Sequence, residues 1–413
     1  MTDTEKVVSM YDKYIMNTYK RIPLCLEKAK GAKVWDIDGK EYLDFFPGWA
    51  VSGIGHCHPW VASAVAKQAR KLMHVSNNYY SKLQATLAEE IIKYSFPGKV
   101  FFANSGAEAN EAAVKLARLY GSRTGRYEII TMLKSFHGRT LAMIAATGQE
   151  KVKHGFEPLP EGFKHIPFND LEAVKEAITD KTIGIMLEPV QCEGGINIAS
   201  PEYMKSLRKI CDEKDIVLIF DEVQTGMCRS GEMFAFKNYN VTPDVVTLAK
   251  ALGGGLPIGA CVAREKFQDV LAPGTHASTF GGSPIVCAGA LAVFKAIRKE
   301  KLLKNTRRMS ALLKKKLGGL KSKHHHLIKE VRVMGLIIGI ELNIKGEDVY
   351  KECLKEGLLI NCTQDTVLRI MPPLNVMKKQ VDRAISTLDR VFSYFDTREG
   401  GFYEERYHLD RRT

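Results

Sequence analysis

Short apolar runs alternate with longer stretches of helical periodicity between about residues 85 and 300. The runs at 100–102, 128–132, 183–187 and 216–220 each form the centre of a strand-sized segment with few charged residues. Strands that are apolar on both faces are typical of a parallel sheet, and the segments between the runs are long enough for crossover helices. The pattern therefore predicts an α/β fold with a mostly parallel sheet covered by helices on both faces.

The two ends of the chain have a different pattern. Residues 1–30 favour a helical arm, and residues 33–45 favour a hairpin that turns at Asp38-Gly39. Pro59 is suited to open a helix over residues 60–73.

Near residue 300 the pattern changes again. A basic amphipathic helix is predicted over 301–320, followed by strand-like runs at 330–342 and 358–360. We therefore expect four parts, which are an N-terminal arm and hairpin associated with the small domain (1–50), a large domain (51–300), a smaller α+β domain (301–397) and a charged tail (398–413).

Charge and composition narrow the class of protein. The chain has 413 residues, of which 45% are hydrophobic, and its formal net charge is +13. The basic residues are scattered, and we find no basic stripe interleaved with aromatic residues. Nucleic-acid binding is therefore disfavoured, whereas a positive field would attract anionic substrates and a phosphate-bearing cofactor.

The cysteines and the N-terminus bear on location. Nine cysteines without a Cys-x-x-Cys pair favour a reducing cytoplasm. No signal peptide and no apolar run of membrane-spanning length is expected. The residues His56-Cys57-His58-Pro59 lack a fourth zinc ligand at a suitable spacing and favour a structural turn. We expect residues 324–326, three histidines, in a surface loop rather than at a metal.

Two charged residues end apolar runs. Lys250 follows the run 245–249 and precedes a glycine cluster, and Asp221 follows the run 216–220. A charge at the end of a buried strand is costly unless it has a partner, and glycines let a bulky ligand approach the backbone. Either residue alone is explained most simply as a strand that ends in charge. Together they suit pyridoxal phosphate (PLP), which needs a lysine for its Schiff base and an aspartate at its pyridine nitrogen.

Further polar motifs follow predicted strands. Ser105 and Glu108 have the spacing of a capped helix N-terminus, which is a ready phosphate site, although a plain helix cap is the better explanation when the motif is taken alone. Phe136 offers a ring for stacking and Arg139 a guanidinium for a carboxylate. The glycines at 253–255 match neither a Walker loop nor a dinucleotide fingerprint. Other candidates of this kind are Glu188, Glu193, Gln224, Ser278 and Thr279, with Arg369 in the smaller domain.

Together these motifs resemble the class III (subgroup II) aminotransferases of PLP fold type I. The resemblance runs from about residue 22 to about residue 374 and implies a homodimer with shared sites. It is carried jointly by residues 55–59, 104–110, 136–140, 188–195, 221–226, the Lys250 loop, 278–282 and 368–374.

The resemblance also implies the role of each site residue. Lys250, which bears the cofactor, and Asp221, which pairs with its ring nitrogen, are the implied catalytic residues. Glu193 would neutralise Arg369 for an ω-amine donor and swing away for glutamate. The implied cofactor contacts are Ser105, Gly106, Ala107, Phe136, His137, Glu188, Val223, Gln224 and, across the subunit interface, Thr279. The implied substrate contacts are Arg139, Glu193, Ser278 and Arg369, and no metal is implied.

The implied reaction moves an ω-amino group from N-acetylornithine, or a similar ω-amino acid, to 2-oxoglutarate. The alternative donors are 4-aminobutyrate, ornithine, succinyl-diaminopimelate and a diamine. Trp49 stands where the similar ornithine aminotransferases carry tyrosine, which weakens the case for free ornithine, and Cys192 replaces a usual glycine. A PLP decarboxylase or aminomutase is less favoured, because it would not need both Arg139 and the Arg369–Glu193 pair. The alternative from a different class is a non-catalytic basic binding module.

Overall fold

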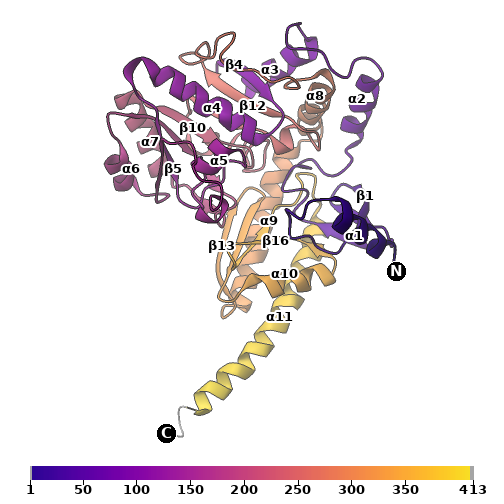
Figure 1. Ribbon diagram of the computed structural model, residues 1–413. Coiled ribbons are helices and arrows are strands. Elements are labelled where there is room, and N and C mark those ends of the chain that lie inside the picture. The colour runs from indigo at the N-terminus through magenta and orange to yellow at the C-terminus, as the bar shows by residue number, and fades with distance from the viewer. Residues whose placement is uncertain (1, 410–413) are drawn as a thin grey trace.

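A seven-stranded sheet forms the centre of the larger part of the molecule (Figure 1). The computed structural model describes the backbone of residues 2–409 and the side chains of residues 2–396, so the expected charged tail at 398–413 lies outside the described side chains. Across the sheet the strands are β4 (Gly98–Ala103), β12 (Gly259–Arg264), β11 (Val245–Leu248), β10 (Val217–Asp221), β7 (Thr182–Leu187), β5 (Glu128–Met132) and β6 (Phe163–Ile166).

Only β12 interrupts the parallel arrangement of this sheet. It pairs antiparallel with both β11 and β4. The strands β11, β10, β7, β5 and β6 are parallel to one another. The prediction of a mostly parallel sheet is therefore confirmed. Because all these parallel strands point the same way, their carboxyl ends lie together along one edge, where open α/β sheets bind ligands.

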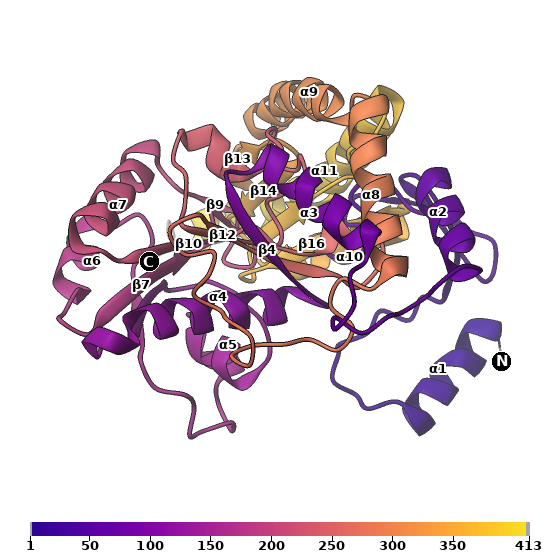
Figure 2. The ribbon, with the colours of Figure 1, turned by 90° about the horizontal axis from the view of Figure 1, so that it is seen from above.

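Helices cover both faces of the sheet. The alternate residues Val217 and Ile219 of β10 belong to a core cluster with the alanine-rich helix α4 (Gly106–Gly121). Leu218 and Phe220, which point the other way, belong to the main core with α7 (Pro201–Lys214). Figure 2 shows α4 and α7 on either side of the strands. This burial on both faces explains why the strands are continuous apolar runs.

A second, four-stranded sheet lies below the large one in Figure 1 and is antiparallel throughout. Gly335, in the left-handed region at φ +59°, makes the tight turn between its first two strands. The predicted basic helix is confirmed as α9, and α11 continues beyond residue 397. The elements of this part are α9 (Leu302–Lys323), β13 (Ile328–Met334), β14 (Ile337–Leu342), α10 (Gly346–Lys355), β16 (Asn361–Thr363), β17 (Val367–Ile370) and α11 (Lys378–Leu409).

The N-terminal segment joins a third sheet. The predicted hairpin is confirmed as β2 (Lys33–Asp36) and β3 (Glu41–Asp44), with Gly39 at φ +85° in the turn. The prediction of a helical arm over residues 1–30 is only partly right, because α1 (Asp3–Tyr14) ends early and residues Leu26–Lys30 form strand β1 against β2. Strand β15 (Leu358–Leu359) completes this sheet by pairing parallel with β3.

The remaining regular elements are mostly short helices around the large sheet. The helix predicted over 60–73 is α2, which ends at Ala69. Helices α2 and α8 pack together on the side of the large sheet that faces the N-terminus (Figure 2). These elements are α2 (Pro59–Ala69), α3 (Lys82–Tyr94), α5 (Leu141–Ala146), α6 (Leu171–Ala177), β8 (Val190–Gln191), β9 (Asn197–Ile198) and α8 (Pro284–Lys299).

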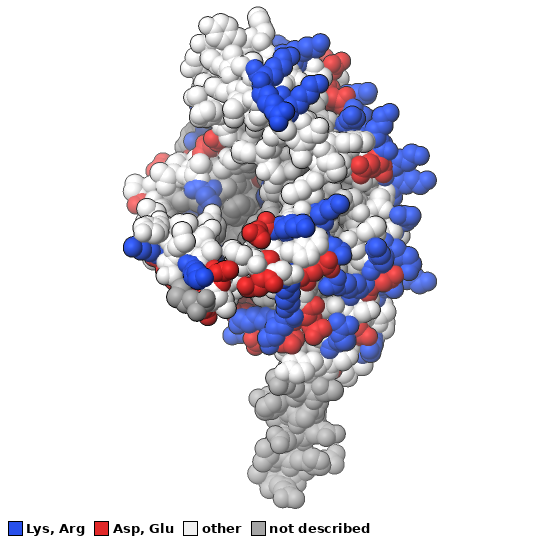
Figure 3. All heavy atoms as spheres, turned by 90° about the vertical axis from the view of Figure 1, so that its right-hand side faces the viewer, with Lys and Arg blue, Asp and Glu red and all other residues white. Residues whose placement is uncertain are grey.

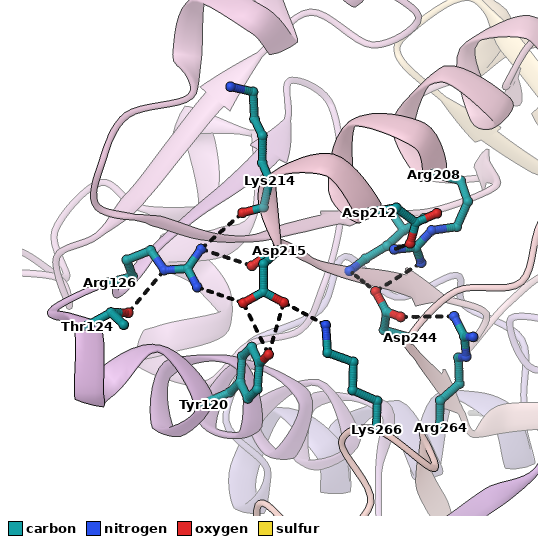
Figure 4. Close-up of polar contacts among 11 residues, drawn as sticks. Tyr120, Thr124, Arg126, Arg208, Asp212, Lys214, Asp215, Asp244, Arg264 and Lys266 are labelled. Atoms are coloured by element: carbon teal, nitrogen blue, oxygen red, sulfur yellow. Dashed lines mark hydrogen bonds and ion pairs between the residues drawn. The ribbon is translucent and has the colours of Figure 1, made fainter.

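Ion pairs gather at the opposite edge, where β10 and β11 begin (Figure 4). Asp215, just before β10, accepts hydrogen bonds from Arg126, Tyr120 and Lys266 at 2.6–3.1 Å. Asp244, just before β11, pairs with Arg208 and Arg264. The amino ends of β10 and β11 are thus flanked by ion pairs.

The histidine run agrees with the expected surface loop only in part, because residues 325 and 326 are exposed in the turn after α9. His324 is buried, not on the surface, and its ring contacts the carboxylates of Asp389 and Asp396 on α11. It caps α9 and fastens that helix to α11, a role that its polar neighbours in the sequence did not indicate. Among the described residues, no group of three or more His, Cys, Asp and Glu side chains could bind a metal ion.

Surface charge is mixed on the face drawn in Figure 3, where blue lysine and arginine side chains are interspersed with red acidic ones. In the part of the chain that the structure describes, no helix combines the length and apolar character that crossing a bilayer requires.

Candidate active site

A cavity of about 500 Å³ opens at the carboxyl ends of β10 and β11, at the N-terminus of α4. Most of the residues predicted from the sequence line it. They are Ser105, Gly106, Ala107, Phe136, His137, Arg139, Glu188, Glu193, Asp221, Val223, Gln224 and Lys250. The segments that carry them are far apart in the chain, and the common edge of the sheet brings them together.

Asp221 ends β10 and is buried, with 4% of its surface exposed. Its Oδ2 accepts hydrogen bonds from Asn110 Nδ2 at 2.7 Å and contacts His137 Nδ1 at 2.9 Å. Its Oδ1 accepts from the backbone N–H of Val223 at 3.0 Å. Hydrogen bonds of this kind fix the orientation of the Asp221 carboxylate, which lines the cavity.

Lys250 follows β11 and has a left-handed backbone, with φ +44°. A non-glycine residue in that region is strained, and such strain concentrates at functional sites. Burial lowers the pKa of the Lys250 ammonium, and this loss of hydration outweighs the nearby negative charges of Glu193 and Asp221. A lysine of this kind is more often neutral near pH 7 than a surface lysine, as a nucleophile or base requires.

The N-terminus of α4 forms one wall. Ser105 is its N-cap and accepts from Glu108 N at 3.2 Å, as predicted, although the Glu108 carboxylate returns to Asn104 N rather than to Ser105 N. Gly106 is packed so closely that an added Cβ would lie 2.8 Å from Val223 Cγ1. Free backbone N–H groups at a helix N-terminus, beside a glycine, suit a phosphate.

Two buried polar atoms at the cavity have no partner among the described residues, Gln224 Oε1 and His137 Nε2. Leaving such atoms unpaired is costly, so their presence indicates that a polar ligand belongs there. Together with a cradle for phosphate, a buried aspartate and a lysine whose pKa is lowered, they fit PLP.

Glu188, which follows β7, is buried and accepts from Phe136 N at 3.0 Å. Burial and the negative charge of Asp221 hold its pKa well above the ordinary value. Glu188 therefore binds its proton more tightly than an ordinary glutamate does.

Arg369 and Glu193 form an ion pair beside the cavity, and of the two only Glu193 is among the residues that line it. Arg369 is fully buried, and its Nη1 and Nη2 donate to the two Glu193 oxygens at 2.7 and 3.2 Å. Burial alone would raise the pKa of Glu193, but the charge and hydrogen bonds of Arg369 outweigh it, so the pKa is lowered. The remaining donors of Arg369 meet Asn361 Oδ1 and the carbonyl oxygen of Cys192.

Two aromatic rings face the same guanidinium. The centroids of Phe46 and Trp49 lie 4.6 and 5.1 Å from Arg369 Cζ. Trp49 reaches this position through a left-handed backbone, at φ +60°. Rings at this distance attract a cation, so Arg369 is held in place by aromatic faces as well as by Glu193.

The other candidate substrate residues lie nearer the surface. Arg139 lines the cavity, is exposed, and lies with Cζ 5.1 Å from the Phe136 ring. Ser278 Oγ accepts from Asn104 Nδ2 at 3.1 Å, which ties the 278–281 loop to the N-terminus of α4. Ser278 and Thr279 are not among the residues that line the cavity of the single chain, and Thr279 is exposed.

Asn110, which was not among the residues predicted from the sequence, links three parts of the site. Its amide donates to Asp221 and to the carbonyl of His137, and its Oδ1 accepts from Thr247 Oγ1 at 2.6 Å. A signal was present, because Asn110 is a polar residue on the alanine-rich buried face of α4. Asn361 and Phe46, which contact Arg369, had no comparable signal.

A lysine and a buried aspartate at neighbouring strand ends, facing a helix N-terminus, define a PLP enzyme of the α/β class. The chain belongs to the class-III aminotransferases, whose family model matches residues 14–392. The protein is therefore a PLP-dependent transaminase.

Individual relatives agree with this assignment. The chain is 52% identical to an acetylornithine aminotransferase of Methanocaldococcus jannaschii, over 94% of this chain and 98% of that protein. Its structure is similar to that of an ornithine aminotransferase of Toxoplasma gondii (TM-score 0.93, 32% identity, 96% and 97% of the two chains). It is also similar to an N-acetylornithine aminotransferase of Stenotrophomonas maltophilia (TM-score 0.81, 34% identity, 94% and 99%).

Proposed function

We propose that the protein transfers the ω-amino group of N-acetylornithine, or of a closely similar ω-amino acid, to 2-oxoglutarate. The observation that carries the proposal is the buried Arg369 paired with Glu193. Arg369 can bind a substrate carboxylate, and it pairs with Glu193 when the bound substrate has no carboxylate at that position. Such an arrangement suits an enzyme whose two substrates carry their carboxylates at different positions. The acetylornithine aminotransferases that resemble the chain at 44–52% identity support N-acetylornithine as the donor.

Each catalytic residue has a proposed task. Lys250 is the covalent attachment point of the cofactor, and its neutral Nζ then takes a proton from one substrate carbon and returns it to another. Asp221 holds a negative charge at the ring nitrogen and is itself oriented by Asn110 and His137. When bound, PLP supplies a cationic ring that draws electrons from a substrate carbon that is losing its proton.

The remaining contacts follow from position. The backbone N–H groups of Gly106 and Ala107, with Ser105, receive the phosphate, Phe136 stacks on the ring, and Gln224 meets the ring oxygen. His137, Glu188 and Val223 complete the wall around the ring. Arg139 and Ser278 bind the distal end of the substrate, and Arg369 binds the α-carboxylate of glutamate or 2-oxoglutarate.

We also propose a homodimer in which Thr279 of one subunit reaches the phosphate held by the other. Large exposed apolar side chains on the Asn77 and Ser278 segments, which hydrogen-bond to each other, support this arrangement, with Tyr79 and Phe280 exposed to 69% and 61%. The pairing of β3 with β15 supports the grouping of residues 1–50 with a small domain at 301–397, apart from a large domain at 51–300. Nine free cysteines support a cytoplasmic location.

A donor panel tests the proposal. N-acetylornithine, ornithine, 4-aminobutyrate, succinyl-diaminopimelate and a diamine are each supplied with 2-oxoglutarate, and glutamate is measured. We expect the highest kcat/KM with N-acetylornithine, and preference for another donor would replace it. Lys250→Ala is expected to abolish turnover and the label left by borohydride reduction of the holoenzyme, and a label on another residue would overturn the assignment of Lys250.

A further inference from the structure

Arg229 is a fully buried arginine without an acidic partner among the described side chains. It and Arg369 are the two largest fully buried side chains that the structure describes. Arg369 meets Glu193, whereas Arg229 forms no ion pair within the described residues, and its Nη2 has no hydrogen-bond partner there. Burial lowers the pKa of Arg229 to about 10, so the side chain is still charged at neutral pH. A charge kept in this costly position indicates a purpose beyond filling space.

The guanidinium of Arg229 joins elements that carry different parts of the site. Its Nη1 donates to the carbonyl of Pro372 and, at 3.5 Å, to that of Leu336. Leu336 follows the β13–β14 turn, and Pro372 comes three residues after Arg369, just beyond β17. Arg229 itself belongs to the segment that leaves β10 at Asp221.

Backbone contacts show that the join is tight. The carbonyl of Arg229 accepts from Leu336 N at 2.8 Å. A Cβ on Gly335 would lie 2.3 Å from that same carbonyl oxygen, so the turn approaches the Arg229 loop as closely as a glycine allows. Met227 and Cys228, just before Arg229, have left-handed backbones at φ +55° and +70°. This strained loop is therefore held in one position by the turn that it meets.

The Pro372 segment also organises the aromatic side of the pocket. Met371 N donates to the carbonyl of Phe45, and Leu374 N to that of Gly53, both at 2.7 Å. The loop between these two anchors carries Phe46 and Trp49, whose rings face Arg369. A displacement at Pro372 would therefore move both the guanidinium and the rings beside it.

We propose that Arg229 is a positioning residue that sets the separation between the Asp221 segment and the Arg369 strand. Its planar fork supplies charged donors to carbonyls on two elements, which an apolar residue of similar length cannot do. The separation decides whether a dicarboxylate can reach Arg369 while its keto carbon lies at Lys250. The inference rests on the proposed role of Arg369 in binding the carboxylate of 2-oxoglutarate.

The test separates the acceptor from the donor. In Arg229→Met, KM for 2-oxoglutarate is expected to rise about tenfold or more, because small misplacements of a binding group have large effects. The kcat/KM for the donor and the dissociation constant of PLP from the apoenzyme are expected to change less than about threefold, since Arg369 stays paired with Glu193 while the donor is bound. Arg229→Lys should recover part of the loss. Arg208→Met, at the other edge of the sheet, is the matched control, expected to lower Tm without changing KM.

The outcomes decide between the two proposals. Equal losses with donor and acceptor, or a folded Arg229→Met with unchanged KM for 2-oxoglutarate, would overturn the role of Arg229. If Arg229→Met does not fold, Arg229→Lys and Arg229→Gln decide by the same ratio. Arg369→Lys is measured alongside, because an unchanged KM for 2-oxoglutarate in that variant would reject the proposed role of Arg369 itself.

Discussion

Replacing Glu193 with alanine tests the exchange of partners at Arg369. The substitution removes a carboxylate that meets Arg369 at 2.7 and 3.2 Å and leaves Asn361, the Cys192 carbonyl and two aromatic rings around the guanidinium. The buried charge then lacks its counter-charge in the free enzyme. A substrate carboxylate can supply one.

The expected change in kcat/KM follows from the free energy of the Arg369–Glu193 ion pair in the free enzyme. Breaking a buried ion pair by removing one partner costs about 3–5 kcal/mol, and the remaining contacts of Arg369 favour the lower end. If glutamate takes the place of Glu193 as proposed, it has to displace that carboxylate in the wild type, whereas in the variant nothing has to be displaced. About 3 kcal/mol of relief corresponds to a kcat/KM for glutamate that is roughly 10²-fold higher. The donor leaves Arg369 as it is in the free enzyme, so its kcat/KM should change little.

Single-turnover measurements of the two half-reactions, followed by the visible absorbance of the cofactor, give the two kcat/KM values separately. The free variant should also unfold at a lower temperature than the wild type, and glutamate or 2-oxoglutarate should restore most of the loss. Glu193→Gln should lie between the two. Glu128→Ala, which breaks the Glu128–Lys164 pair far from the cavity, serves as the control. Equal changes in both half-reactions, or an increase confined to the donor, would refute the exchange of partners.

Three further predictions concern the cofactor side of the cavity. Because burial lowers the pKa of Lys250, its labelling by trinitrobenzenesulfonate in the apoenzyme, followed by mass spectrometry, should have a lower pH midpoint than the labelling of free Nα-acetyllysine, and equal midpoints would contradict this. Gly106→Ala would place a methyl group 2.8 Å from Val223 and should weaken PLP binding to the apoenzyme by about 1–3 kcal/mol. An unchanged dissociation constant would show that Val223 shifts to make room for the methyl group. Because burial and Asp221 raise the pKa of Glu188, Glu188→Gln, which has the shape of the protonated acid, should retain more of the wild-type kcat as the pH is lowered, and a ratio of variant to wild-type kcat that does not change with pH would contradict this.

The large sheet could be predicted because its strands are buried on both faces. Such strands are continuous apolar runs, and the run at 216–220 matches β10 within one residue at each end. The antiparallel orientation of β12 had no such signal, since an apolar strand has the same residue pattern in either direction. Strand β1 was missed because Leu26–Lys30 is polar and largely exposed, and only its partner β2 defines it.

Candidate residues were predictable where a charge follows an apolar strand, as with Asp221 and Lys250. Their neighbours were harder to predict, because hydrogen bonds such as that of Asn110 to Asp221 join residues 111 positions apart. His324 was placed wrongly for the same reason, since its aspartate partners lie on a helix more than sixty residues further along. A pattern along the chain indicates which residues are buried, and partners that lie far apart in the sequence depend on the fold.

The joining of β3 to β15, and of Phe45 to Met371, has a consequence for biosynthesis. Phe46 and Trp49, whose rings lie beside Arg369, are synthesised early in translation. Arg369 itself is synthesised more than three hundred residues later. A nascent chain on the ribosome can complete most of the large sheet before any acceptor pocket exists. Contacts so distant in sequence form slowly, so this pocket should be among the last parts of the enzyme to mature.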